Sequence, residues 1–280
     1  MKLKLLIPLM FLIISPSLKA QEEGSVRSIV SSTMIGMGTS DVLDTYLTPL
    51  DYKGIDITLL NERLRLTRNE KRLNQQFLWG SYTSNDNEAE NGMVVSGFIG
   101  YSWGTLWRFN PIEHLTLAVG PVGSIETGFI YNLRNGNNPA SAKLSVEAGA
   151  SVLALYQLKI KKFPLTLRLQ SSLPTMSVFF SPHYEQSYYE IFQLGNTEGI
   201  VHFGSFHNQF NLDNYFTVDI PVSSMNLRVG FRNIIRNTHV NEIKNRRVSN
   251  TFMIGFSKEF IPFNRKKGHK SSQQIHSPLF

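Results

Sequence analysis

Three arginines at a spacing of four are the feature of this sequence that most directly suggests binding chemistry. Arg228, Arg232 and Arg236 lie in a stretch with the alternating pattern of a strand, so their side chains point to one face. A row of guanidinium groups on an inner surface favours anionic groups, which predicts a polar path or pocket. The same side chains also allow a structural role, in which ion pairs fill an interior. The ionisable residues expected on that interior are Arg108, Glu126, Arg134, Lys143, Glu147, Arg168, Arg228, Arg232 and Arg236, with Glu259 near the end of the last strand.

A second candidate is the segment 173–193, which is dense in aromatic residues and contains two prolines. A central strand does not tolerate proline, so we expect this segment to be an extracellular loop or a wedge packed inside a barrel. A ligand platform is the alternative, because Tyr and Phe offer large contact areas and Tyr adds a polar tip. Its aromatic residues are Phe179, Phe180, Tyr184, Tyr188, Tyr189 and Phe192.

Catalytic chemistry has a weaker signal. Ser205 and His207 are two residues apart, with Asn211 close behind, and on a strand the first two would point the same way. Some outer-membrane barrels hydrolyse lipids with a serine and a histidine, but in the order His-x-Ser, which this pair does not match. The histidines show no metal-ligand spacing, and no phosphate loop or dinucleotide fingerprint is present. We predict no catalytic residue, no metal and no cofactor, and keep a lipid-modifying enzyme as an alternative.

The elements that must position these residues are long strands. Three runs, 93–109, 115–133 and 142–156, alternate between large apolar residues on one face and Gly, Ser, Ala and a few charges on the other. Strands of soluble domains usually have about five or six residues. A soluble sandwich would also place many Lys and Glu on its second face. Long strands with a small, weakly polar second face predict a transmembrane antiparallel β-barrel with a narrow lumen.

Counting strands along the whole chain gives about twelve, with ten to fourteen as the range. The short connections 68–70, 110–114, 159–164, 195–199 and 221–224 would then be periplasmic, and the longer ones extracellular. The expected strands are residues 28–39, 54–67, 71–83, 93–109, 115–133, 142–156, 165–171, 188–194, 200–207, 214–220, 225–236 and 249–260.

The two ends of the chain predict export. Residues 1–20 have two lysines, an apolar run of about ten residues and small residues before Gln21, the pattern of a cleaved signal peptide. The barrel is expected over 21–263, and a basic, disordered tail over 264–280. Three lysines of the leader leave +4 of the net charge of +7, and four basic residues of the tail carry that remainder. The barrel itself is therefore close to neutral, which excludes nucleic acid as a partner. The chain has no cysteine, so we expect neither disulfides nor a lipid anchor.

Two stretches, SPHYEQSYYEIF and DTYLTPLDYKG, resemble a family of functionally uncharacterised exported proteins from gut-type Gram-negative bacteria. The resemblance implies an exported, β-rich protein of about this size. It supplies no activity, ligand or catalytic residue.

Together these patterns predict an outer-membrane β-barrel that acts as a narrow pore or a ligand-binding surface protein. Its expected partners are outer-membrane lipid and, during biogenesis, the barrel-insertion machinery; the ligand is unknown. A lipid-modifying enzyme and a plugged structural or adhesion barrel are the alternatives.

Overall fold

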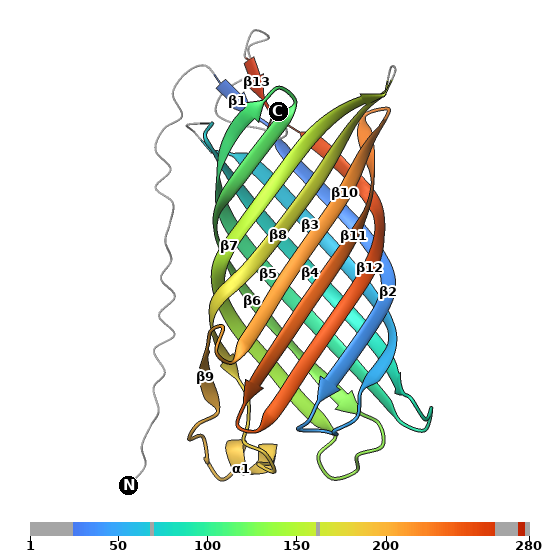
Figure 1. Cartoon of the computed structure of the whole chain (residues 1–280), viewed down its shortest axis with the longest axis vertical. Helices are drawn as coiled ribbons and strands as arrows, with labels where there is room; N and C mark the ends of the chain where they lie inside the picture. The colour runs from blue at the N-terminus through green and yellow to red at the C-terminus, as the bar shows by residue number, and fades with distance from the viewer. Residues whose placement is uncertain (1–24, 68–69, 161–162, 261–273, 278–280) are drawn as a thin grey trace.

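A computed structural model describes residues 25–67, 70–160, 163–260 and 274–277, which form a closed antiparallel β-barrel (Figure 1). Ten long strands close the ring: β12 pairs with β2, β8 pairs with β10, and the short β9 extends β8. The number of strands is at the lower end of the predicted range. The strands are β2 (Ile29–Asp44), β3 (Tyr52–Leu66), β4 (Arg72–Asn87), β5 (Met93–Ile112), β6 (Leu115–Asn132), β7 (Ala140–Ile160), β8 (Phe163–Phe180), β9 (Val201–Gly204), β10 (Gln209–Val222), β11 (Met225–Val240) and β12 (Ile243–Phe260).

Alternation along each strand separates an apolar outer face from a filled inner face. On β3, Leu59 is 58% exposed and Leu60 is 2% exposed. The exposed outer residues of β3 are apolar between Lys53 and Arg63, which are both exposed as well. β7 has 21 residues, more than the roughly nine to eleven that a tilted membrane strand needs. An apolar outer belt on long tilted strands identifies a transmembrane barrel.

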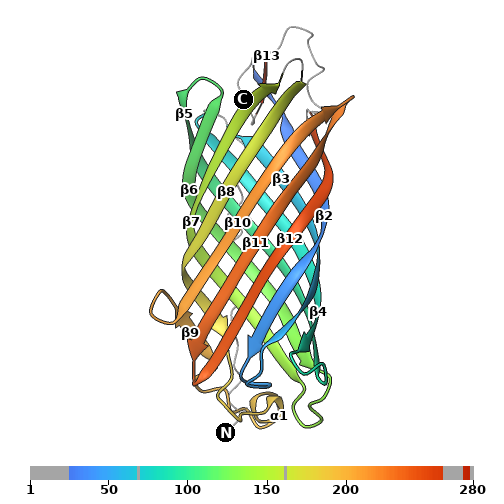
Figure 2. The ribbon, with the colours of Figure 1, turned by 45° about the vertical axis from the view of Figure 1, so that its right-hand side comes forward.

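The two ends of the barrel differ, and we call them the turn end and the loop end. At the turn end, tight turns such as Glu113–His114 and Ser223–Ser224 join neighbouring strands. At the loop end lie the longer connections, including residues 181–208 with helix α1 (Tyr188–Phe192) and β9 (Figure 2). Among the described residues, no helix is long and apolar enough to span a bilayer.

The expected strand 188–194 is wrong, because Tyr188–Phe192 forms helix α1. Ser187 caps it: the Ser187 side chain accepts a hydrogen bond from the Glu190 backbone N–H, and the Glu190 carboxylate accepts one from the Ser187 backbone N–H. This capping box is visible in the sequence as Ser-x-x-Glu. The expected strand 200–207 shortens to β9, because Ser205 already begins the turn that leads to β10.

The first and last described strands meet beside the turn end. β1 (Ser25–Arg27) and β13 (Gln274–His276) pair in parallel, so three residues of the predicted disordered tail form a strand (Figure 1). The predicted signal peptide, residues 1–20, and tail residues 264–273 lie outside the described residues.

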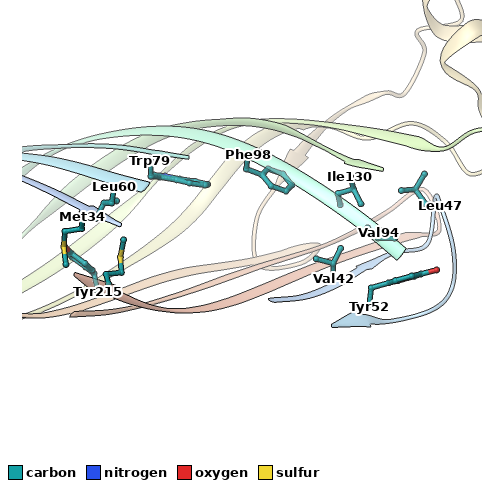
Figure 3. Close-up of a cluster of buried hydrophobic side chains, with 11 residues drawn as sticks. Met34, Val42, Leu47, Tyr52, Leu60, Trp79, Val94, Phe98, Ile130 and Tyr215 are labelled. Atoms are coloured by element: carbon teal, nitrogen blue, oxygen red, sulfur yellow. The ribbon is translucent and has the colours of Figure 1, made fainter. Parts of the chain in front are cut away.

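The barrel interior is filled by apolar side chains in two groups. A leucine layer near the turn end consists of Val30, Leu64, Leu66, Leu73, Leu106, Ala118, Leu153 and Leu155, each at most 4% exposed. A second cluster extends from Met34, Leu60 and Tyr215 in the middle of the barrel to Val42, Tyr52 and Leu47 at the loop end (Figure 3). The charged residues of the interior lie between and around these groups.

The backbone ladder of the wall is interrupted at one place, the seam between β8 and β10. These strands pair from Thr166/Asp219 to Ser172/Asp213 and no further toward the loop end. Beyond that point β8 contains Pro174 and a register shift against β7, and its last residues pair with β9 instead. We call the unpaired stretch, residues 173–176 of β8 and 209–212 of β10, the seam gap.

Candidate functional site

A central network of ion pairs fills the middle of the barrel. Glu62 on β3 accepts hydrogen bonds from Arg168 on β8 and from Arg228 on β11, the latter at 2.8 Å. Arg228 also binds Asp219 through both carboxylate oxygens, at 2.6 and 2.7 Å. Gln75 donates to Glu62 at 2.8 Å. The four charged side chains are 1–3% exposed and their formal charges cancel. Such a matched, buried set is the structural ion-pair role that the sequence allowed.

Aromatic rings separate this network from the loop end. The Arg168 guanidinium lies 5.0 Å from the ring centroid of Tyr215, and that of Arg232 lies 5.0 Å from Trp79. Phe77 packs edge-on against Tyr215 at 5.9 Å. Cation–π contacts of this kind stabilise desolvated arginines. The middle of the lumen is therefore occupied by side chains.

An outer cluster of charges lies between the aromatic layer and the loop end. Arg247 on β12 donates to Glu126 on β6, and the Arg236 Nε lies 3.7 Å from the other oxygen of Glu126. Arg232 pairs with Asp213 at 2.6 Å. Its last member, Glu147 on β7, accepts hydrogen bonds from Asn211 at 2.6 Å and Ser124 at 3.2 Å. Five strands thus contribute to one polar site.

Two small cavities border the outer cluster. One, of about 60 Å³, is partly open and is lined by Lys143, Ser145, Phe179, Phe180, Asn245 and Arg247 among others. The other, of about 50 Å³, reaches the seam at Ser172, Pro174 and Asp213. Both are lined by Glu126, Glu147 and Arg236. Each has room for several water-sized groups.

The outer cluster has more hydrogen-bond donors than its protein acceptors use. Among the described residues, four buried donor atoms there have no hydrogen-bond partner in the protein: Arg232 Nη1, Arg236 Nε, Asn245 Nδ2 and Arg247 Nη1. The buried acceptor of the described outer cluster without a hydrogen bond is Glu126 Oε2, which forms the 3.7 Å ion pair with Arg236 Nε, so three donors are left over. Buried polar atoms without partners cost free energy, so this surplus indicates a place for an acceptor-rich group.

Residues 173–180 of the aromatic segment belong to β8, so the expectation that the whole segment is a loop or a wedge is wrong for this part, and Phe179 and Phe180 line a cavity. The remainder, with helix α1, lies at the loop end (Figure 1). Tyr188 stacks between Phe180 and Phe192, with ring centroids 6.3 and 6.1 Å apart. Its hydroxyl accepts the Ala142 backbone N–H, and Tyr46 packs edge-on at 5.9 Å. Burial raises the pKa of Tyr188 to about 12. Of the other predicted aromatics, Phe179 is buried, whereas Tyr184, Tyr189 and Phe192 are 54–70% exposed.

A family profile matches residues 4–267, under the description "Protein of unknown function (DUF3316)". The chain belongs to this family. No curated protein matches it.

Several solved structures resemble the family's barrel. The transport unit of the autotransporter AIDA-I from Escherichia coli aligns at 10% identity and TM-score 0.45, covering 88% of this chain and 92% of that one. The outer membrane protease OmpT from Escherichia coli aligns at 8% identity and TM-score 0.44, covering 83% and 97%. The translocator domain of the autotransporter NalP from Neisseria meningitidis aligns at 9% identity and TM-score 0.40, covering 86% and 91%. At these values the likenesses carry no conclusion about activity.

Of the ten predicted interior charges, the structure places Arg168 and Arg228 in the central network, and Glu126, Glu147, Arg232 and Arg236 in the outer cluster. Arg134 is wrong, because it lies after the end of β6, is exposed, and donates to the Asn91 carbonyl. Arg108 is also wrong as a member of the cluster. It is only half-buried, near the turn end of β5.

Sequence reasoning missed the acidic partners. Glu62, Asp219, Asp213 and the cation Arg247 all complete ion pairs inside the barrel. The sequence could have indicated them, because each lies at a position of its strand that alternation assigns to the inner face. Glu62, for example, lies two residues from the buried Leu60 and Leu64. The predicted interior residues Lys143 and Glu259 bind Asp44 and Ser28, respectively.

Ser205 and His207 do not form the strand pair that a hydrolase would need. Both lie in the turn between β9 and β10, where the Ser205 backbone N–H donates to the Asn208 side chain. Asn211 points inward to Glu147. Within the described part of the chain, no group of three or more His, Asp or Glu side chains could hold a metal ion.

Proposed function

We propose that this protein is an outer-membrane β-barrel of a Gram-negative bacterium that binds a small polar ligand at its extracellular end. The apolar belt supports membrane insertion, and the loop end faces outward in this proposal, because outer-membrane barrels have short periplasmic turns and longer extracellular loops. Export through the signal peptide and assembly by the barrel-insertion machinery belong to the same proposal.

The two halves of the lumen differ, and this difference favours ligand binding over a pore. The leucine layer and the central network fill the half of the barrel nearer the turn end. The outer cluster instead borders cavities and has donors to spare. A pore needs a continuous polar path, and the leucine layer interrupts it. A pocket needs only one open side.

Single cysteines test this reading, because the chain has none of its own. Ser145→Cys places a thiol at the cavity, and Ala118→Cys places one in the leucine layer. In vesicles holding the refolded mature protein, a charged, membrane-impermeant maleimide should label Ser145→Cys and leave Ala118→Cys unlabelled. Both positions point inward, so they are matched controls for accessibility.

Planar-bilayer recordings give the independent measurement. The protein should insert, migrate in a heat-modifiable manner on gels and show no steady conductance, while a porin reconstituted in the same way conducts. Steady conductance together with labelling of Ala118→Cys would show an open pore and reject the proposal.

A further inference from the structure

The seam gap exposes an unusual stretch of backbone in a membrane barrel. Residues 173–176 of β8 pair with β7 on one side and with no strand of the described structure on the other. Residues 209–212 of β10 pair only with β11. A side-chain hydrogen bond from Ser177 to Gln209 bounds the gap toward the loop end. The backbone ladder between β8 and β10 is therefore interrupted over a short length and bounded by contacts on both sides.

Two residues of the sequence explain why the ladder between β8 and β10 is interrupted here. Pro174 has no N–H to donate, and proline is confined to edge strands and bulges. It lies directly beside a register shift and opposite Gly149, where an added Cβ would come within 2.2 Å of the Leu173 carbonyl oxygen. Proline on one strand and a required glycine on the next keep this part of β8 from acting as an ordinary central strand.

A ladder of polar side chains crosses the outer face at the level where the seam opens. Ser171 donates to Asn214 at 2.8 Å, Asn214 to Asn233 at 3.2 Å, and Asn233 to Asn250 at 2.9 Å. These residues are direct register partners on β8, β10, β11 and β12. The next outward row toward the turn end is apolar: Leu169, Phe216, Phe231 and Phe252.

The amides of the ladder are hydrogen-bonded to one another, and the next outward row toward the loop end, with Leu212, Ile235 and Val248, is apolar again. Hydrocarbon cannot satisfy unpaired backbone groups, so an interrupted strand ladder is not left facing lipid tails. The seam gap therefore indicates a polar group that passes between the strands there, with the apolar rows of the outer face available to a hydrocarbon tail.

On the inner side of the barrel, the seam gap borders the outer cluster. The cavity of about 50 Å³ is lined by Pro174 and Ser172 from the edge of β8 and by Asp213 from β10, and also by Arg232 and Arg236. These two arginines carry two of the four donors without a hydrogen-bond partner in the protein. Arginine donors bind carboxylate and phosphate groups more strongly than neutral acceptors.

We propose that the ligand is an amphiphile with an anionic head, a carboxylate or a phosphate, which enters sideways through the seam gap. The head binds Arg232, Arg236 and Arg247, and the tail stays on the outer apolar face. This inference rests on the proposed function, because it names the ligand class and the route for the same pocket.

The probes are dodecanoate and dodecyl phosphate, with acetate and inorganic phosphate as tail-less counterparts and dodecanol as the uncharged one. Binding is measured to the mature protein in phosphatidylcholine nanodiscs, after subtraction of binding to empty nanodiscs. Both tailed anions should bind at least about tenfold more tightly than the tail-less ions or dodecanol. Asn245→Ala or Arg247→Ala should weaken the binding of both tailed anions by about tenfold or more. A difference between dodecanoate and dodecyl phosphate separates a fatty-acid-like from a phospholipid-like head.

A blocking experiment tests the route. Leu212→Cys carries a bulky maleimide at the mouth of the gap, and Leu169→Cys carries the same label one row below the ladder, where the seam is paired. Labelled Leu212→Cys should lose binding by at least about tenfold relative to its unlabelled form, and labelled Leu169→Cys should keep it.

The outcomes separate the two proposals. If acetate and phosphate bind as well as the tailed anions and the label has no effect, the pocket is real and the lateral route is wrong. If no probe binds above empty nanodiscs, the ligand-binding function fails as well. If oxidised Leu212→Cys forms a disulfide-linked dimer in high yield, the gap is an interface between two copies, which also overturns the amphiphile proposal.

Discussion

Removing the Glu62 carboxylate tests whether the central network stabilises the folded barrel. Glu62 is 2% exposed and accepts hydrogen bonds from Arg168, Arg228 and Gln75. Glu62→Ala leaves Arg168 without its carboxylate, while Arg228 keeps Asp219. Breaking one side of a buried ion pair costs about 3–5 kcal/mol. We expect a loss in this range in the free energy of unfolding.

The measurement is urea unfolding of the refolded mature protein in lipid vesicles, followed by tryptophan fluorescence. Glu62→Gln keeps an acceptor but loses the charge, so its loss should be smaller. Glu62→Met combined with Arg168→Met should recover at least about 1 kcal/mol, because an apolar pair removes the unpaired cation. Glu88→Ala, at an exposed loop position, is the matched control and should change little. A loss below about 0.5 kcal/mol for Glu62→Ala would refute the view that these charges are buried and mutually dependent.

Four further predictions concern the loop end and the wall. Ser187→Ala removes the cap of α1 and should cost the helix about 1 kcal/mol, seen as faster proteolysis of the loop. Hydrogen bonds from Ser187 hold the pKa of Glu190 below its ordinary value, so the stabilisation is present at neutral pH and should be lost on acidification; the same proteolysis compared at pH 7 and pH 3 checks it. The pKa of Tyr188 is raised from 10.0 to about 12, so its packing should persist at neutral pH and be lost as the pH rises through that interval, and an absorbance titration of Tyr188→Phe should show one tyrosine fewer ionising near pH 12 than the unchanged protein. Gly38→Ala would place a Cβ 1.8 Å from the Asn250 carbonyl oxygen, so it should abolish the heat-modifiable folded form on gels.

The barrel class could be predicted from the sequence because alternation along a strand is a local property. The outward residues of β5 and β6, such as Ile99 and Ile125, are exposed as the pattern requires. Helix α1 was missed because the aromatic residues near Tyr188 obscure a five-residue helix whose clearest signal is its cap. Short helices have little periodicity to detect.

The interior site was only half predictable, for a physical reason. The alternation of side chains between the two faces of a strand identifies which arginines point inward, as for Arg228 and Arg232. It does not identify their partners, because Glu62 meets Arg228 across the lumen, 166 positions away in sequence. The seam gap is still less accessible, since it depends on how the long connection after Phe180 lets β10 rejoin β8.

The location of the seam also determines where the strands of the wall should separate first. The first and last barrel strands pair along their full length, from Asn245/Asp44 to Phe260/Ile29. The shortest ladder of the ring is instead in its interior sequence, between β8 and β10. Backbone amides beside residues 173–176 and 209–212 should therefore exchange hydrogen fastest in the wall. Under mechanical stretching, the barrel should open between β8 and β10, and not between β12 and β2, the last and first strands of the ring.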